Sequence, residues 1–270
     1  MSLLSPSDAL SLAQKPGVLF VDTRPVSAWS DATIPGAVQL EAYKYFIRES
    51  TEDGIRAMVA GLRNAFAAIG VDKAHTVIFF EEATGMISPR ALWFHELCGL
   101  PGGHILDGGI SGWRQAGGET VAGRGVTTGI SDGDPAAAGQ FRRDLVTTTA
   151  QAREAQANPR LIDTRDPEEW DGSFTHACCK RAGRLPHSEH LFYADLLLDQ
   201  RYRSPAELAQ IAKAHGLDAQ DDIIVYCHRG ARAATVLYAL REAGFDNLAI
   251  YTGGWHEWSA DETLPIVAGP

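Results

Sequence analysis

The sequence predicts an α/β protein made of two homologous halves, each with a mostly parallel central sheet flanked by helices. The chain has 270 residues, about twice a common domain length. Apolar residues make up 45%, which is ordinary for proteins with a buried core. Short apolar runs alternate with helical patterns in each half, and this order is typical of α/β folds.

Two stretches of sequence occur twice at a nearly constant offset. Residues 19–24 (LFVDTR) return as 161–165 (LIDTR), and residues 107–113 (DGGISGW) return as 252–258 (TGGWHEW). Self-similarity of this kind decides the number of domains. We therefore expect one domain over residues 1–124 and a second over 142–270. Residues 125–141 are rich in Gly, Ser, Thr, Asp and Pro, which indicates a linker.

The first half contains one apolar strand pattern between two helical patterns. Residues 76–80 form a short β-branched and aromatic run, the pattern of a buried strand. A helix is expected from about residue 51 to 69, ended by Gly70. A second helix should begin at Ser88 and Pro89 and end at Gly99.

The second half repeats this order. Strands are expected at residues 160–162 and 223–226, which are apolar without alternation and so suit a parallel sheet. Ser204 offers a helix cap with Pro205 and Glu207 in the first turn, and this helix should end at Gly216. Another helix is expected over residues 231–243, with Gly244 as its end.

Charge and cysteine content exclude several functional classes. The net charge of -10 argues against a nucleic-acid partner. No run approaches the roughly 20 apolar residues of a membrane helix, and the N-terminus lacks the pattern of a signal peptide. Four scattered cysteines do not make a disulfide scaffold. We therefore expect a cytoplasmic protein, and no nucleotide or flavin motif predicts a cofactor.

Cys227 is the cysteine best placed to react. It directly follows the strand at 223–226 and precedes a helix, where open α/β sheets bind ligands. Unpaired amides and the helix dipole favour an anion at this position, and basic neighbours favour a thiolate. A buried, inert cysteine is the alternative, but it predicts apolar neighbours. The following residues are His228, Arg229, Gly230, Ala231 and Arg232.

The chain resembles the tandem-domain rhodaneses, the thiosulfate and 3-mercaptopyruvate sulfurtransferases, over nearly its whole length. The resemblance rests on the repeated Asp-Thr-Arg and Gly-Gly stretches, on residues 32–37 (ATIPGA) and on the six-residue loop 227–232. It implies that Cys227 carries a persulfide and that the other five loop residues bind the substrate. Related phosphatases and arsenate reductases have an arginine six positions after the cysteine, whereas Arg232 lies five positions after Cys227.

The first half lacks the nucleophile. Alignment of the strand ends places Glu81 where Cys227 stands, and a carboxylate cannot form a persulfide. The resemblance therefore implies a catalytically degenerate N-terminal domain. Glu81 could act as a general acid, but we favour the alternative in which it accepts hydrogen bonds from the N-terminal amides of the following helix.

The loop composition favours thiosulfate as the sulfur donor, with 3-mercaptopyruvate as the alternative. His228, when protonated, and Arg229 would attract a dianion. The resemblance implies a thiol or cyanide as acceptor. Asp163 and Arg184 are further substrate-binding candidates. Lys180, Arg181 and Arg184 lie in an insertion of the second half, where Trp170 and Pro186 are 16 positions apart and the matching Trp29 and Pro35 only 6. For Asp163 the competing account is a structural ion pair with Arg165.

Other readings of the cysteines stay open. His176, Cys178, Cys179, His187 and His190 could suggest zinc, but adjacent cysteines are poor ligands for one tetrahedral ion and no Cys-x2-Cys spacing occurs, so we expect no metal. Cys178 could form a redox pair with Cys227 if their Cα atoms lie within about 7 Å. A phosphatase or arsenate reductase, or a persulfide carrier without turnover, are the competing functions.

Overall fold

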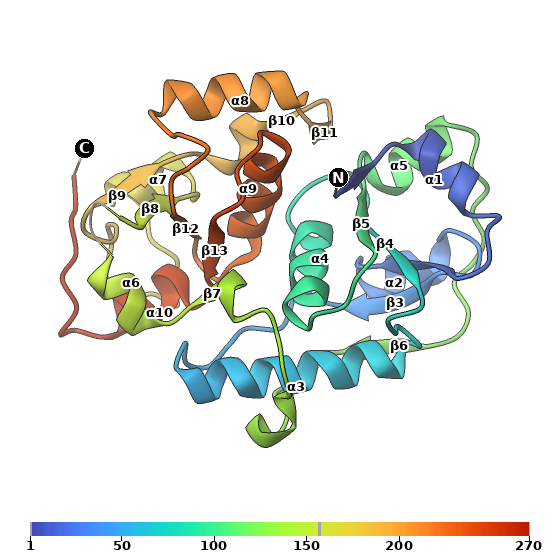
Figure 1. Cartoon of the computed structure of the whole chain (residues 1–270), viewed down its shortest axis with the longest axis horizontal. Helices are drawn as coiled ribbons and strands as arrows, with labels where there is room; N and C mark the ends of the chain where they lie inside the picture. The colour runs from blue at the N-terminus through green and yellow to red at the C-terminus, as the bar shows by residue number, and fades with distance from the viewer. Residues whose placement is uncertain (1, 156–157, 270) are drawn as a thin grey trace. The chain divides into compact units, whose positions relative to one another are not determined.

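A computed structural model describes residues 2–155 and 158–269, which divide into two compact units (Figure 1). Unit 1 holds the described residues within 1–45, 56–142 and 199–202. Unit 2 holds those within 46–55, 143–198 and 203–270. Each unit therefore includes one short segment from the other half of the sequence.

Unit 1 is built on a six-stranded parallel sheet in the order β1-β5-β4-β2-β3-β6. These strands are β1 (Leu3–Leu4), β2 (Val18–Asp22), β3 (Val38–Glu41), β4 (Thr76–Phe80), β5 (Gly103–Leu106) and β6 (Thr127–Gly129), and the short β11 (Arg201–Tyr202) lies outside this sheet. The helices are α1 (Pro6–Leu12), α2 (Val26–Asp31), most of α3 (Glu52–Ala68), α4 (Ile87–Leu97), α5 (Gly109–Gln115) and the 3-10 helix η1 (Pro135–Ala138).

Unit 2 is built on a five-stranded parallel sheet in the order β7-β13-β12-β8-β9. These strands are β7 (Val146–Thr147), β8 (Arg160–Asp163), β9 (Ser188–His190), β12 (Ile223–Tyr226) and β13 (Leu248–Tyr251), and β10 (Leu197–Leu198) lies outside the sheet. The helices are α6 (Thr149–Glu154), α7 (Pro167–Asp171), α8 (Pro205–Ala214), α9 (Ala231–Glu242) and α10 (Gly254–Ala260), with 3-10 helices η2 (Arg143–Leu145) and η3 (Tyr193–Leu196).

The two sheets have corresponding strand orders, which confirms the fold class predicted from the repeats. Strand β4 is flanked by β2 and β5, and β12 is flanked by β8 and β13. The register agrees as well, because Asp22 lies opposite Phe80 and Asp163 lies opposite Tyr226. The residues after β4 and β12 therefore occupy equivalent places at the carboxyl edges of their sheets.

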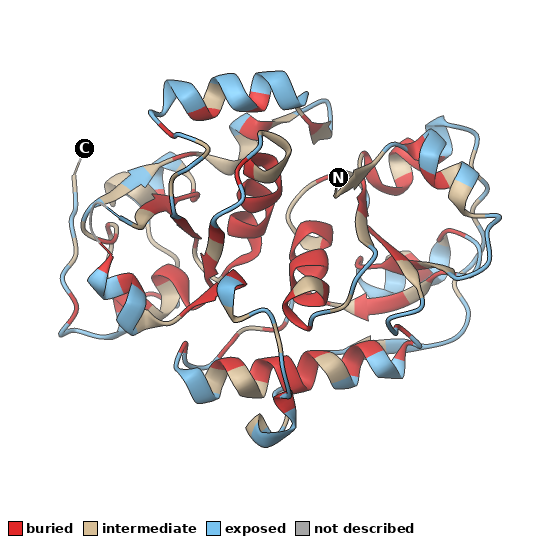
Figure 2. Ribbon diagram, in the orientation of Figure 1, coloured by how far each residue is buried: buried red, intermediate tan, exposed pale blue. Residues whose placement is uncertain are grey.

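The predicted helices form close to their expected bounds. Ser204 and Glu207 make a reciprocal capping box at the start of α8, because each side chain accepts from the other residue's backbone N–H. A glycine with a positive φ follows each of three predicted helices, as helix ends commonly require; these are Gly70, Gly99 and Gly244. Figure 2 shows α4 and α9 buried along most of their length, since they pack on β4 and β5 and on β12 and β13.

The segment expected to be a linker has structure of its own. Residues 127–129 form β6, which pairs in parallel with β3 at the edge of the sheet in unit 1. Further along, the backbone passes so close to α3 that a Cβ atom on Gly61 would lie 1.8 Å from the Ser131 carbonyl oxygen. Composition alone indicated a linker because a three-residue edge strand leaves almost no periodic signal.

No helix within the described residues is both long enough and apolar enough to cross a membrane.

His95 is a buried titratable group in the core of unit 1. It lies on α4 with no solvent exposure, packed edge-to-face against Phe66 and Phe79. Neither ring nitrogen has a hydrogen-bond partner among the described residues. Burial, followed by the charge of His104, lowers the pKa of His95 to about 4. The ring is therefore neutral in the folded protein at neutral pH.

This pKa predicts a loss of stability in mild acid. Between pH 6.5 and about 4 the unfolded chain binds a proton at residue 95 that the folded chain does not, so stability falls as the pH falls. His95→Leu should remove about 2 kcal/mol of the loss between pH 7 and pH 5. Urea unfolding of both proteins at the two pH values measures the difference. Equal losses in the two proteins would contradict the account.

Candidate functional site

Cys227 directly follows the carboxyl end of β12 and is the first residue of the loop that leads into α9. Its side chain is buried, with 1% exposure, and its Sγ accepts a hydrogen bond from the Gly230 N–H at 3.0 Å. Gly230 has φ +86°, and a Cβ atom there would come within 3.0 Å of the Thr252 Oγ1. The loop thus turns back on the sulfur at a position that favours glycine, and α9 presents its positive end.

The loop is held in place by the start of α10. The Trp255 N–H donates to the Cys227 carbonyl at 2.8 Å, and the His256 N–H donates to the His228 carbonyl at 3.1 Å. Gly254 is the first residue of α10 and has φ +55°. A Cβ atom at this position would lie 2.3 Å from the Cys227 carbonyl oxygen. The repeated Gly-Gly sequence therefore has a physical reason, which is the close approach of two backbones.

Unit 1 contains the same arrangement with a carboxylate in place of the thiol. The Glu81 Oε1 accepts from the backbone N–H groups of Gly85, Ile87 and Ser88 at 3.0 to 3.2 Å, and from the Ser88 hydroxyl. The Ile110 N–H donates to the Glu81 carbonyl beside Gly109, as Trp255 does to Cys227. Burial raises the pKa of Glu81. The expectation that Glu81 caps the following helix is confirmed.

Arg232 turns its guanidinium toward two carboxylates. Its Nη1 pairs with Asp166 and Glu169, and its Nη2 donates to Glu169 at 3.1 Å. Burial alone would raise the pKa of Glu169, but the hydrogen bond and charge of Arg232 outweigh it and lower the pKa to about 2. Arg232 was expected to bind the substrate as a loop residue, and its positive charge is here balanced by these two carboxylates.

Arg229 brings a positive charge into the loop. Its guanidinium lies 4.2 Å from the ring centroid of Phe46, a cation–π contact, and its Nη2 lies 3.3 Å from both ring nitrogens of His256. Phe46 belongs to the segment 46–55, which is part of unit 2. Aromatic contacts therefore position this arginine.

His228 is surrounded by other polarisable groups. Its Nε2 lies 3.5 Å from the Cys178 Sγ and 3.3 Å from the Cys179 Sγ, and its ring stacks on His176 at 4.4 Å between centroids. Burial lowers the pKa of His228 to about 3, and the charges of His176 and Arg229 add to the effect. The expectation that His228 contributes a cation is wrong, because the buried ring is neutral at neutral pH.

Asp163 and Arg184 form hydrogen bonds with other parts of unit 2. Both carboxylate oxygens of Asp163 accept from the Arg165 guanidinium, and Oδ1 also accepts from the Arg165 N–H at 3.0 Å. This is the structural ion pair that competed with a substrate role. Arg184 lies over the Trp170 ring at 4.3 Å and donates to backbone carbonyls, including that of Gly269. It holds the C-terminal segment.

The other two basic residues of the insertion, Arg181 and Lys180, also contact the protein itself. Arg181 donates to four backbone carbonyls at and beyond the end of α10, those of Trp258, Ser259, Asp261 and Leu264. Lys180 forms an exposed pair with Glu262. Trp255 is buried under the Arg165 guanidinium, 4.8 Å from its ring, so it packs in the core.

Three residues near the loop were not predicted from the sequence: His256, Tyr193 and Phe46. His256 lies two positions after the repeated Gly-Gly pair, which could have indicated it. Tyr193 at the start of η3 lies close enough to Asp166 and Cys227 that, after burial, their charges help to raise the pKa of its hydroxyl. Phe46 lies more than 150 positions before Arg229, and no local signal connects the two.

Comparison with known proteins identifies the family. The model of the rhodanese-like domain matches residues 5–116 and again 147–261, so each half contains one match. The chain belongs to the tandem rhodanese family of sulfurtransferases. The resemblance seen in the sequence is thereby confirmed.

The names of individual relatives give different sulfur donors. A probable 3-mercaptopyruvate sulfurtransferase of Pseudomonas aeruginosa is 30% identical, over 75% of this chain and 71% of that protein. A thiosulfate sulfurtransferase of Corynebacterium glutamicum is 27% identical, over 94% of this chain and 86% of that protein. The crystal structure of a probable thiosulfate sulfurtransferase is 28% identical with a TM-score of 0.69, over 95% of this chain and 99% of that one. Sulfur transfer is common to all three, whereas the donor is not.

The contact between α10 and the Cys227 loop can be tested at Gly254. Gly254→Ala would place a methyl group against the Cys227 carbonyl, so we expect a loss of stability and a displaced loop. Gly216→Ala is the matched control, since Gly216 also has a left-handed φ (+68°) but no atom within 4 Å of a Cβ. The control should cost about 1–2 kcal/mol.

Thermal and urea unfolding of the two variants measure the difference. Gly254→Ala should be clearly the less stable, and alkylation of Cys227 should change only in that variant. Equal stability of the two variants, with unchanged alkylation, would show that the close approach does not hold the loop.

Proposed function

We propose that the protein is a thiosulfate sulfurtransferase that carries sulfane sulfur on Cys227. The observation that carries the proposal is the hydrogen bond from the Gly230 N–H to the Cys227 Sγ, at the amino end of α9. An amide that already points at the sulfur in the resting protein can stabilise a negative charge on that sulfur without reorganisation.

The reaction has two steps that share one covalent intermediate. The Cys227 thiolate attacks the outer sulfur of thiosulfate, a sulfur–sulfur bond forms, and the bond to the departing sulfite breaks. A thiolate or cyanide then attacks the outer sulfur of the Cys227 persulfide, and the Cys227 thiolate is regenerated. The products are a persulfide of the acceptor or thiocyanate. Covalent catalysis of this form gives ping-pong kinetics.

Arg229 supports thiosulfate as the donor. Its guanidinium lies over the Phe46 ring and beside the His256 ring. His228 is neutral and Arg232 is balanced by Asp166 and Glu169. The attraction for a dianion therefore comes mainly from Arg229 and the amino end of α9. The alternative donor is 3-mercaptopyruvate.

Mass spectrometry of the thiosulfate-treated protein tests the nucleophile. The intact protein should gain the mass of one sulfur atom and lose it when cyanide is added. Cys227→Ser should not gain this mass, because serine cannot form a persulfide. Cys98→Ser is the matched control, since Cys98 is also a buried free cysteine, and it should be loaded like the unchanged protein.

Steady-state rates then distinguish the donors and the competing functions. The value of kcat/KM with cyanide should be higher for thiosulfate than for 3-mercaptopyruvate. The reverse order would identify the alternative donor. Stoichiometric loading without turnover would indicate a persulfide carrier, and no loading at all would contradict sulfur transfer through Cys227.

A further inference from the structure

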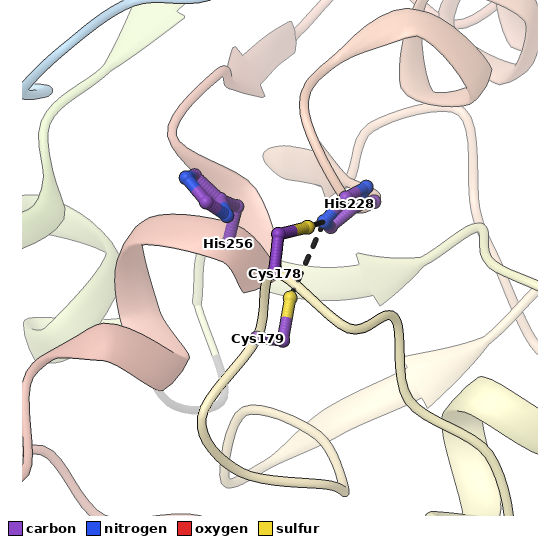
Figure 3. Close-up of side chains that lie close together, drawn as sticks. All are labelled: Cys178, Cys179, His228 and His256. Carbon is purple, nitrogen blue, oxygen red and sulfur yellow. Dashed lines mark hydrogen bonds between the residues drawn. The ribbon is translucent and has the colours of Figure 1, made fainter.

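Two cysteines and two histidines gather beside the reactive loop in unit 2. They are Cys178 and Cys179 from the insertion after α7, His228 from the loop and His256 from α10 (Figure 3). One ligand atom from each residue lies within 4.8 Å of the other three. Cys227, the reactive cysteine, is not part of this group.

A tight turn explains how adjacent cysteines can face the same point. The Cys179 N–H donates to the His176 carbonyl at 2.8 Å, which folds the backbone back at residues 176–179. Figure 3 shows both sulfurs directed toward the His228 ring. The objection that adjacent cysteines suit one ion poorly holds for an extended chain, in which neighbouring side chains point to opposite sides, but not for this turn.

The spacing agrees with a tetrahedral ion. With zinc–sulfur and zinc–nitrogen bonds of about 2.3 and 2.0–2.1 Å, sulfur and nitrogen ligands on a tetrahedron lie about 3.6 Å apart. The His228 Nε2 lies 3.5 Å from the Cys178 Sγ and 3.3 Å from the Cys179 Sγ. Two edges of the tetrahedron are therefore already in place, and the remaining pairs of ligand atoms lie within 4.8 Å of one another.

We propose that Cys178, Cys179, His228 and His256 bind one zinc ion in a closed tetrahedral site. Two thiolates and two imidazoles are a ligand set that zinc accepts, whereas magnesium and calcium require oxygen ligands. The proposal goes beyond sulfur transfer and does not depend on it. It replaces the expectation from sequence that the protein has no metal site.

The surroundings suit a bound cation with thiolate ligands. On binding, each thiol loses its proton to the solvent, so zinc and two thiolates together carry no net charge. The Arg229 Nη2 lies 3.3 Å from both His256 ring nitrogens, so on binding it gives up the nitrogen that takes the zinc and then faces a neutral centre instead of a second cation. His176 stacks on the His228 ring at 4.4 Å and fixes its orientation, as groups around metal ligands commonly do.

The ion would join three segments of unit 2: the reactive loop, the start of α10 and the insertion after α7. His228 and His256 are already linked through the His256 N–H and the His228 carbonyl. The cysteine turn adds the insertion after α7, which is otherwise fixed near α10 by Arg181. A zinc ion would therefore tether the insertion to the reactive loop, one residue away from Cys227.

Metal titration of the reduced, metal-free full-length protein tests the proposal. Zinc should bind with a stoichiometry of one ion per chain, measured by calorimetry and by competition with a chromogenic chelator. Cobalt(II) in place of zinc should give the strong visible absorption of a tetrahedral site and a thiolate charge-transfer band. Cys178→Ser and His256→Gln should each weaken zinc binding by more than about tenfold.

Two cysteine variants serve as controls. Cys227→Ser and Cys98→Ser should keep full zinc binding, because neither residue belongs to the cluster. Loss of zinc in Cys227→Ser would place the ion on the reactive cysteine and overturn the proposal. Absence of stoichiometric binding, or a cobalt spectrum without the thiolate band in the unchanged protein, would overturn it independently of how the variants fold.

Discussion

Two backbone hydrogen bonds from the start of α10 to the carbonyls of Cys227 and His228 fix the loop on which the site depends. They require the bare backbone of Gly254, since a Cβ atom would collide with the Cys227 carbonyl. With the carbonyls held on one side, the left-handed Gly230 turns its N–H toward the sulfur on the other. The loop is therefore preorganised by its neighbours, and the position of Cys227 follows from them.

The two units use one scaffold with a different side chain at the end of the central strand, Glu81 after β4 and Cys227 after β12. In unit 1 the Glu81 carboxylate accepts from three amides and a hydroxyl, so the loop that follows β4 is filled by its own side chain. In unit 2 the shorter cysteine side chain takes the equivalent place after β12. The comparison indicates that the scaffold selects for a hydrogen-bond acceptor at the strand end, and that the side chain decides whether chemistry can follow.

The sequence was informative wherever a feature depends on neighbours along the chain. The strand at 223–226, the capping box at Ser204 and the place of Cys227 before a helix all depend on local patterns, and they form as predicted. The charges of the loop were harder to predict because they depend on burial and distant partners. Arg232 is balanced by Glu169, 63 positions earlier, and His228 is neutral because the fold covers it. The cysteine and histidine cluster needed the turn at residues 176–179, which composition does not indicate.

A crystal structure of the protein after reaction with thiosulfate would test the central claim most directly. The account predicts one additional sulfur atom bonded to the Cys227 Sγ, with backbone N–H groups of residues 228–232 directed at it and the α10 contacts unchanged. An additional sulfur on Cys178 or Cys179, with Cys227 unmodified, would contradict it. So would a persulfide on Cys227 that points away from the loop amides.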